Sequence, residues 1–199
     1  MIRLFRAGAG LIATGVLLAG CAAITSAPPG PARVGGTEMT LGRQWSDVSI
    51  LMPGRSKKVR VLSIDGPLLN RLYVSDGLSP GDYLIRPVQK ERPTPMIRTD
   101  MTVTERIEFV TDSISAMDYQ RVEASRPRPA VLDGSPAVRF DISAKSQDGL
   151  DISGAALASE VRGMTYVVIY LAPAEHYFEA TLGEVESIMA SVRPQLRRR

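Results

Sequence analysis

Four Asp-Gly pairs divide the chain into segments of strand length, and they constrain its fold more than any other feature. The pairs are Asp65-Gly66, Asp76-Gly77, Asp133-Gly134 and Asp148-Gly149. Such pairs tolerate the positive φ of tight hairpin turns, and strands joined by hairpin turns run antiparallel. Between the last two pairs, residues 135–147 alternate apolar and polar side chains, as in a strand with one buried face. The sequence therefore predicts an antiparallel sheet.

Further segments extend this predicted sheet. Residues 150–161 lead to a turn at Arg162-Gly163, and residues 164–172 then carry apolar side chains on both faces, as a covered central strand does. Residues 119–124 lead into the same meander. Upstream, residues 48–52, 58–64 and 72–75 also have strand character. Residues 68–73 fit a helical turn equally well, so the start of the last of these segments stays open.

Two segments have the periodicity of helices. Thr102 and Glu105 have the spacing of a capping box, and apolar residues follow at helical intervals. These are Ile107, Val110, Ile114 and Met117. A second stripe consists of Phe178, Leu182, Val185, Met189 and Val192, and Pro194 ends it. Each helix has one apolar face, so each is expected to pack on the sheet, which makes the fold class α+β.

The N-terminal segment has the plan of a secretory signal peptide. Arg3 and Arg6 precede residues 7–20, which carry no charge and are too few to span a bilayer. Leu18-Ala19-Gly20-Cys21 resembles the lipobox of bacterial lipoproteins. The resemblance implies cleavage between Gly20 and Cys21 and acylation of Cys21, with palmitate or a similar chain on sulfur. The alternatives are an ordinary signal peptide with an incidental cysteine, or a buried helix.

These features give a plan of four parts. Residues 1–20 are the signal peptide, 21–42 the acylated cysteine and a flexible Pro/Gly-rich tether, 43–194 a single α+β domain, and 195–199 a basic tail. Several acyl chains would hold such a protein stably on a membrane, whereas one holds it marginally. By analogy with enteric lipoproteins, Ala22 after the cysteine favours the periplasmic face of the outer membrane over the inner membrane.

The charge and cysteine content exclude several function classes. The chain carries 24 basic and 21 acidic residues, and its excess of basic residues comes from the signal segment and from the three C-terminal arginines. Nucleic-acid binding, which needs Lys and Arg clustered on one face, is therefore not expected. Cys21 is the only cysteine. Once it is acylated, no thiol remains for catalysis, metal binding or a disulfide.

The C-terminal part carries a family resemblance. MTYVVIYLAPAEHYF, residues 164–178, and IMASVR, residues 188–193, resemble the end of Mog1/PsbP-like domains, in which a tyrosine-rich strand, a short loop and a helix close the sheet. By element order the likeness extends over residues 45–193. It implies an α/β/α sandwich, as in proteobacterial lipoproteins with this fold, and an assembly or interaction factor rather than an enzyme. No binding residue of the family matches closely enough to carry over.

Residues that could carry chemistry do not form a catalytic set. Residues 77–81 read G-x-S-x-G, but Pro80 lacks the backbone N–H that a nucleophile elbow needs after its serine, Ser79. His176 is the only histidine, and it has no evident acidic partner. The aspartates do not follow the order of a calcium loop and fit hairpin turns better. We therefore expect no enzyme activity, no cofactor and no metal.

Four residues are the candidates for contact with a partner or ligand. Trp45 either packs the first strand onto the core or offers a ring to a ligand. Tyr166 belongs to an aromatic group with Tyr170, Tyr177 and Phe178 that either fills the core or lines a groove. Arg126 and Arg128, each followed by proline, either protect an edge strand from pairing or bind a partner. The two functional hypotheses are a non-catalytic interaction or assembly module of the envelope, with an envelope protein as partner, and a carrier or sensor of a small apolar or lipid ligand.

Overall fold

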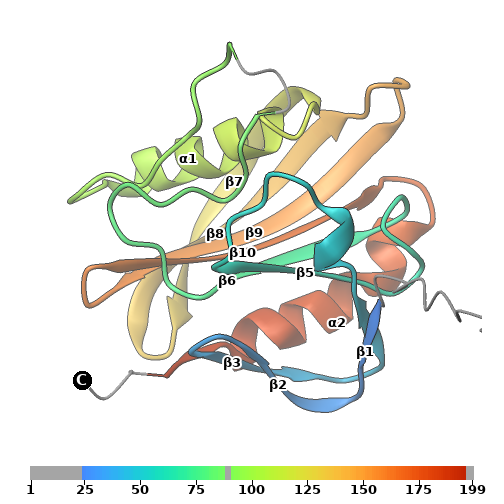
Figure 1. The fold of residues 1–199 in the computed structure, drawn as a ribbon, viewed down its shortest axis with the longest axis horizontal. Helices are drawn as coiled ribbons and strands as arrows, with labels where there is room; N and C mark the ends of the chain where they lie inside the picture. The colour runs from blue at the N-terminus through green and yellow to red at the C-terminus, as the bar shows by residue number, and fades with distance from the viewer. Residues whose placement is uncertain (1–23, 88–90, 196–199) are drawn as a thin grey trace, which may run out of the picture.

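A computed structural model describes residues 24–87 and 91–195 of the chain. Its main element is an antiparallel sheet in the order β1-β4-β5-β6-β10-β9-β8-β7 (Figure 1). The bounds in chain order are β1 Thr25–Ala27, β4 Trp45–Asp47, β5 Val59–Ser63, β6 Arg71–Ser75, β7 Gln120–Leu132, β8 Ser135–Lys145, β9 Asp151–Val161 and β10 Met164–Pro173. The hairpins after Asp133, Asp148 and Arg162 form as predicted, because each has a glycine at positive φ in the turn.

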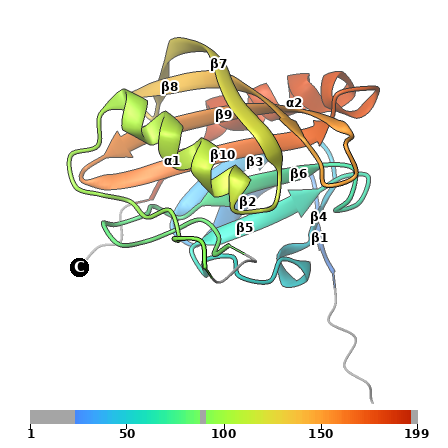
Figure 2. The same cartoon turned by 90° about the horizontal axis from the view of Figure 1, so that it is seen from above.

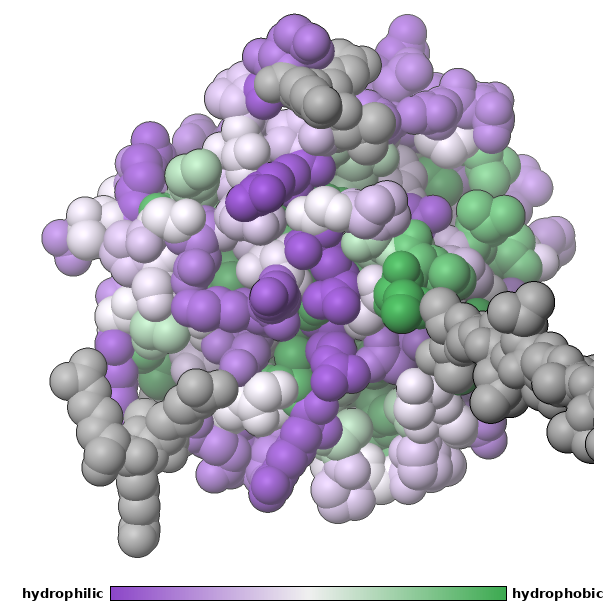
Figure 3. All heavy atoms as spheres, in the orientation of Figure 1, coloured by the Kyte–Doolittle hydropathy of each residue, from purple (hydrophilic) through white to green (hydrophobic). Residues whose placement is uncertain are grey.

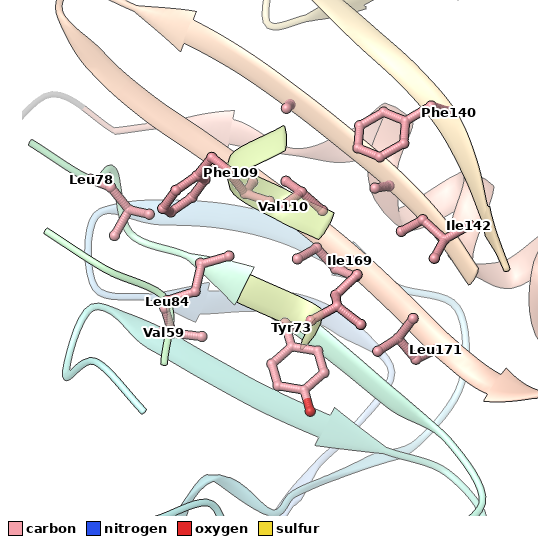
Figure 4. Packing of buried hydrophobic residues seen from close by; sticks show 14 of the residues in the cluster. Val59, Tyr73, Leu78, Leu84, Phe109, Val110, Phe140, Ile142, Ile169 and Leu171 are labelled. Atoms are coloured by element: carbon pink, nitrogen blue, oxygen red, sulfur yellow. The ribbon is translucent and has the colours of Figure 1, made fainter. Parts of the chain in front are cut away.

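Helix α1, Val103–Ser115, covers one face of the sheet. Thr102 and Glu105 form the predicted capping box, with both reciprocal hydrogen bonds present. Phe109 and Val110 point from α1 toward buried side chains of β5, β6, β8 and β10 (Figure 4). This helix face therefore closes the hydrophobic cluster on its side of the sheet.

The opposite face is covered by helix α2, Tyr177–Ser191, and by a second, three-stranded sheet (Figure 1). That small sheet has the order β11-β3-β2, with bounds Gly30–Val34 for β2, Thr37–Leu41 for β3 and Arg193–Pro194 for β11. Tyr170 of β10 stacks on Phe178 of α2, with ring centroids 5.7 Å apart. The α+β class, with helices packed on an antiparallel sheet, is confirmed.

The prediction of a flexible tether over residues 21–42 is wrong for residues 25–41. These residues form β1, β2 and β3, and the domain therefore begins well before residue 43. Val34, Met39 and Leu41 are buried in the α2-side core. Their burial is favourable and offsets the conformational entropy that the segment loses when it becomes ordered. The glycines and prolines serve a hairpin instead: Gly35 has φ +57° in the β2–β3 turn. Residues 21–23 lie outside the described part.

One smaller expectation also changes, and one alternative that the sequence left open is decided. Residues 49–51 form a short 3-10 helix, η1, Ser49–Leu51, and not a strand. The side chain of Asp47 accepts a hydrogen bond from the Ser49 N–H at 2.9 Å, and Ser49 Oγ accepts from Val61 N–H at 2.8 Å in place of a strand ladder. Residues 71–75, in contrast, form a strand after a turn at residues 67–69.

The predicted basic tail, residues 195–199, lies outside the described part except for Gln195. That residue is held by the small sheet: its backbone N–H donates to Gly36 O, and its side chain donates to Glu38 at 2.8 Å.

Candidate functional site

The largest of the surface hollows described here lies where the β7–β8 and β9–β10 turns meet the β2–β3 turn, and it has a volume of about 940 Å³. We call it the Tyr166 hollow. It is lined by Val34, Gly35, Gly36, Lys57, Lys58, Arg60, Asp76, Asp133, Ser135, Val161, Arg162, Met164, Tyr166, Pro194 and Gln195. Segments far apart in the sequence thus build one concave surface, and the N-terminal hairpin forms part of its wall.

Two close backbone approaches shape the hollow. A Cβ atom on Gly35 would lie 1.7 Å from Asp76 Oδ2, and one on Gly77 would lie 2.9 Å from the Tyr166 ring. Both glycines also have positive φ, at +57° and +65°. Asp76 Oδ1 accepts a hydrogen bond from the Gly36 N–H, which fixes the β2–β3 turn against the main sheet. Glycine is therefore required at both positions for the hollow to keep its shape.

The cations of the hollow fall into two groups. Lys58 pairs with Asp82 at 2.5 Å, and Arg60 pairs with Asp47. Lys57 and Arg162 are exposed, and neither has an ion pair within the described residues. The hollow therefore presents two cations that no ion pair within residues 24–87 and 91–195 engages, and the carboxylates of Asp76 and Asp133 line the same hollow.

Tyr166 supplies an aromatic surface to the same hollow. Its side chain is half-buried, and its hydroxyl makes no hydrogen bond within residues 24–87 and 91–195. Burial raises the pKa of the Tyr166 hydroxyl and the charge of Asp76 adds to this, whereas Arg162 lowers it. The hydroxyl is thus a neutral donor at physiological pH and is available to a bound group.

Arg126 and Arg128 lie elsewhere, at a groove of about 370 Å³ between the sheet edge and α2. In this arginine groove, which also holds Arg139, Asp141 and Glu186, the charges are paired with one another. Arg139 is 4% exposed and contacts Asp141 at 2.9 Å and Glu186 at 2.7 Å. Arg126 contacts Asp141 at 2.7 Å, and Arg128 lies within 4 Å of both acids. Arg126 and Arg128, the two predicted contact residues, are therefore paired with carboxylates of the same molecule.

Trp45 takes the packing role of its two predicted alternatives. It is 1% exposed and belongs to the α2-side core, and its Nε1 donates to Glu184 at 3.5 Å. The ring is therefore enclosed in the core, and it has almost no exposed surface to offer a ligand. The structure thus places Trp45, Tyr166 and the arginine pair in three different environments.

The serine and histidine that sequence analysis considered do not meet. Ser79 lies in a turn in which its N–H donates to Asp82 at 2.7 Å, and Leu78 bridges to Thr165 at the start of β10. His176 follows the other end of β10, so the length of the strand, about 30 Å, separates the two. In residues 24–87 and 91–195 there is also no group of three or more His, Cys, Asp or Glu side chains placed to hold a metal.

One buried polar group, the hydroxyl of Tyr73, could not be predicted from the sequence. The hydroxyl of Tyr73, a residue 2% exposed, has no hydrogen-bond partner within the described part of the chain, and it points away from the labelled apolar side chains in Figure 4. The pKa of Tyr73 is raised to about 12, because the effect of burial outweighs that of the nearby Arg71, which lowers the pKa. The group is therefore uncharged, and it contributes no base to the site.

Sequence reasoning also missed most of the Tyr166 hollow. Lys57, Arg162 and Asp76 are ordinary turn residues in the sequence, and only Tyr166 stood out. The one signal was Asp76-Gly77, which was interpreted as a turn. Gly77 does lie in a turn, but Asp76 also accepts a hydrogen bond from the Gly36 N–H and so fixes the β2–β3 turn against the main sheet.

Comparison with known proteins supports the fold and no more. No family model and no curated sequence matches the chain. Among solved structures, cyanobacterial PsbP (CyanoP) from Synechocystis sp. PCC 6803 aligns with a TM-score of 0.54 and 14% identity, over 94% of this chain and 98% of its own. The Saccharomyces cerevisiae Ran-binding protein Mog1p aligns with a TM-score of 0.52 and 8% identity, over 86% and 95%. The chain therefore has a PsbP/Mog1-like α+β fold.

Gly20 and Cys21 lie outside the described residues, and so does the rest of the predicted signal peptide, residues 1–20. Within residues 24–87 and 91–195, neither helix is long and apolar enough to cross a membrane.

Proposed function

We propose that the chain is a lipid-anchored protein of the bacterial envelope, and that its domain is a non-catalytic module that binds an envelope protein. The anchor is inferred from the lipobox-like Leu18-Ala19-Gly20-Cys21 behind a signal segment. The binding role is consistent with the Ran-binding function in the name of Mog1p, a protein of the same fold. Fold likeness alone does not assign function, so the binding role is inferred from the surface of the domain.

The observation that carries the binding role is the composition of the Tyr166 hollow. An aromatic ring with an unpartnered hydroxyl lines the same hollow as Lys57 and Arg162, two cations without ion pairs in the described part of the molecule. Aromatic and arginine side chains in a concave surface are typical of the residues that dominate protein interfaces. We expect the partner to insert an apolar side chain against Tyr166 and to place a carboxylate beside each cation.

Site-specific photo-crosslinking tests this proposal. A photoreactive phenylalanine in place of Tyr166 is expected to give one reproducible crosslinked band in intact envelopes. The same residue in place of Leu150, which is 50% exposed on the β8–β9 turn, is the matched control and is expected to give none. The double variant Lys57→Glu, Arg162→Glu should remove the band while far-UV circular dichroism stays unchanged. A band that survives the charge reversal would contradict the proposed surface.

The second candidate function is a carrier or sensor of a small apolar or lipid ligand. The same hollow favours it, and Trp45 is not part of that hollow. Val34, Val161 and Met164 give the hollow an apolar part beside Tyr166. Native mass spectrometry of the protein extracted from its membrane separates the two candidates. A stoichiometric small molecule that disappears in Tyr166→Ala would support the carrier, and its absence together with the crosslinked band would support the protein partner.

The proposed location is the periplasmic face of the outer membrane, because Ala22 rather than aspartate follows Cys21. A Cys21→Ala variant is expected to leave the outer-membrane fraction and to keep a folded domain, as judged by resistance to limited proteolysis. Continued sedimentation of this variant with outer membranes would contradict the lipid anchor.

A further inference from the structure

If Cys21 is acylated as proposed above, the domain lies closer to the membrane than the predicted tether over residues 21–42 would have placed it. Strand β1 begins at Thr25, four residues after Cys21. Even a fully extended chain advances only about 3.6 Å per residue, so the start of β1 can lie at most about 14 Å from the anchor. The predicted tether would have allowed several times that distance. The corner of the domain at β1 must therefore stay close to the bilayer.

Large apolar side chains are exposed at this corner. Ile24 is 51% exposed, Ile50 is 58% exposed and Leu51 is 43% exposed. Thr25 pairs with Asp47 across β1 and β4, and η1 begins two residues after Asp47, so the register brings Ile24 next to η1. Figure 3 shows hydrophobic side chains gathered over this part of the molecule, which Figure 1 draws as the short, unlabelled teal helical turn near the start of β1.

The polar groups beneath these side chains are already satisfied. The N–H groups of Ser49 and Leu51 donate to Asp47 Oδ1 and Val48 O, each at 2.9 Å. The Arg55 guanidinium donates to Ser49 O at 2.8 Å. Asp47 itself is neutralised by Arg60. Unsatisfied backbone groups make it unfavourable for a segment to enter lipid, and η1 presents few of them.

We propose that Ile24, Ile50 and Leu51 form a membrane-docking patch that inserts into the boundary between head groups and acyl chains of the leaflet that holds the anchor. The lipid is the occupant because the covalent connection holds the patch within reach of the bilayer, whatever else the domain binds. Apolar side chains of peripheral helices enter this boundary in the same way, to a depth of about 5–10 Å. The patch and the acylated Cys21 together fix the orientation of the domain, which a lipid anchor alone leaves free.

Spin labelling tests the docking patch directly, because Cys21 is the only cysteine and its sulfur is acylated in the anchored protein. The full-length anchored protein is purified in detergent as an Ile50→Cys variant, labelled, and reconstituted into protein-free phospholipid vesicles. The matched control is Val131→Cys, which is 65% exposed at the end of β7, on the opposite edge of the sheet. The label at residue 50 is expected to be several-fold less accessible to a water-soluble nickel relaxation agent, and more accessible to oxygen, than the label at residue 131.

Three results would overturn the patch. If the protein floats with the vesicles but both labels are equally accessible to nickel, the anchor stands and the patch does not exist. If the label at residue 50 is shielded only in native membranes, and not in protein-free vesicles, a protein covers the surface instead of lipid. If the protein does not float with the vesicles, the anchor fails, and the patch fails with it because it depends on the anchor.

A second variant guards against a labelling artefact. Ile50→Ser, Leu51→Ser leaves the buried core untouched, and it should therefore keep the unfolding midpoint of the wild type. In this background a label placed at residue 24 by Ile24→Cys is expected to become accessible to nickel. An unchanged, shielded label at residue 24 would contradict the joint insertion of the three side chains.

Discussion

The two edges of the main sheet differ in length and in how they are protected (Figure 2). β7, at one edge, is 13 residues long, whereas β1, at the other, has three. A long edge exposes a row of unpaired backbone groups that can pair with another chain. β7 interrupts that row with two bulges, at which Arg121 and Arg126 have φ near +50°, and with Pro127 and Pro129. β1 has no such device, and it is the edge that continues toward Cys21.

This difference shows two ways of solving one problem. The β7 edge is protected by its own residues, and the protection would persist if the domain were detached from the membrane. The β1 edge is too short to pair stably with another chain, and under our proposal it also lies against the bilayer. If the two edges depend on different interactions, they should respond to different substitutions.

The β1 side depends on core packing through Trp45, which pairs with Ala27 of β1 and is almost fully buried. Trp45→Ala should lower the free energy of unfolding by about 4 kcal/mol, because a buried aromatic ring is lost and a cavity remains. Urea unfolding followed by circular dichroism measures the effect, and Trp45→Phe is the matched control with a smaller loss. A loss no larger than that of a surface substitution would show that this edge is not integrated into the core.

The β7 side depends instead on the charges of the arginine groove. Arg139→Ala is expected to lower the free energy of unfolding by about 2 kcal/mol, because its carboxylate partners lose a buried cation but keep some access to water. Arg128→Ala, at a side chain 46% exposed, is the control and should change stability by less than about 1 kcal/mol. Equal losses in the two variants, again measured in urea, would contradict the central role of Arg139.

A carboxylate next to β1 gives that edge a pH dependence. Burial would raise the pKa of Asp47, but hydrogen bonds from Ser49 and Arg60 outweigh it and hold the pKa below its ordinary value of 3.8. The stabilisation is therefore fully present above that value and disappears as the pH falls through the lower, folded-state pKa. Asp47→Asn should be less stable than the wild type at pH 7, and the gap between their urea midpoints should narrow steadily below pH ~4. A gap that does not change with pH would show that the charge of Asp47 is not involved.

The smallest effect on folding, but a specific effect on association, is expected at the prolines of β7. Pro127→Val, Pro129→Val restores two backbone donors to the edge and should raise the average mass in analytical ultracentrifugation through pairing of β7 edges. Ala124→Val adds the same type of side chain to the same exposed strand without adding a donor, so it should sediment like the wild type. An unchanged mass for the proline variant would mean that the bulges alone protect the edge.

The sequence predicted those elements whose signals are local. The hairpins from residue 120 to residue 173, the capping box of α1 and the stripe of α2 depend on neighbours within a few residues, and all three are present. The small sheet has no local signal, because Val34, Met39 and Leu41 are too few to reveal a core, and the surface that buries them comes from residues 177–194.

The candidate site was predictable to a smaller extent for the same reason. Tyr166 was identified as an aromatic residue near the last strand. The two cations proposed to contact the partner in the same hollow come from the turn before β5 and from the β9–β10 turn, and no spacing in the sequence connects them. Arg126 and Arg128 were correctly placed on an edge strand. Their acidic partners are Asp141 on the neighbouring strand and, for Arg128, Glu186 on a distant helix, so their pairing could not be foreseen.

The contact between β11 and β3 has a consequence for how the protein is made. Glu38 and Gln195 are 157 positions apart, yet they are hydrogen bonded, and Gly36 holds the same C-terminal segment. A polypeptide that is synthesised from its N-terminus therefore exposes β2 and β3 long before their last partner strand, β11, is available. Such distant pairings form slowly. The small sheet therefore cannot close until residues 193–195 have been delivered, and its N-terminal hairpin stays without that partner until then.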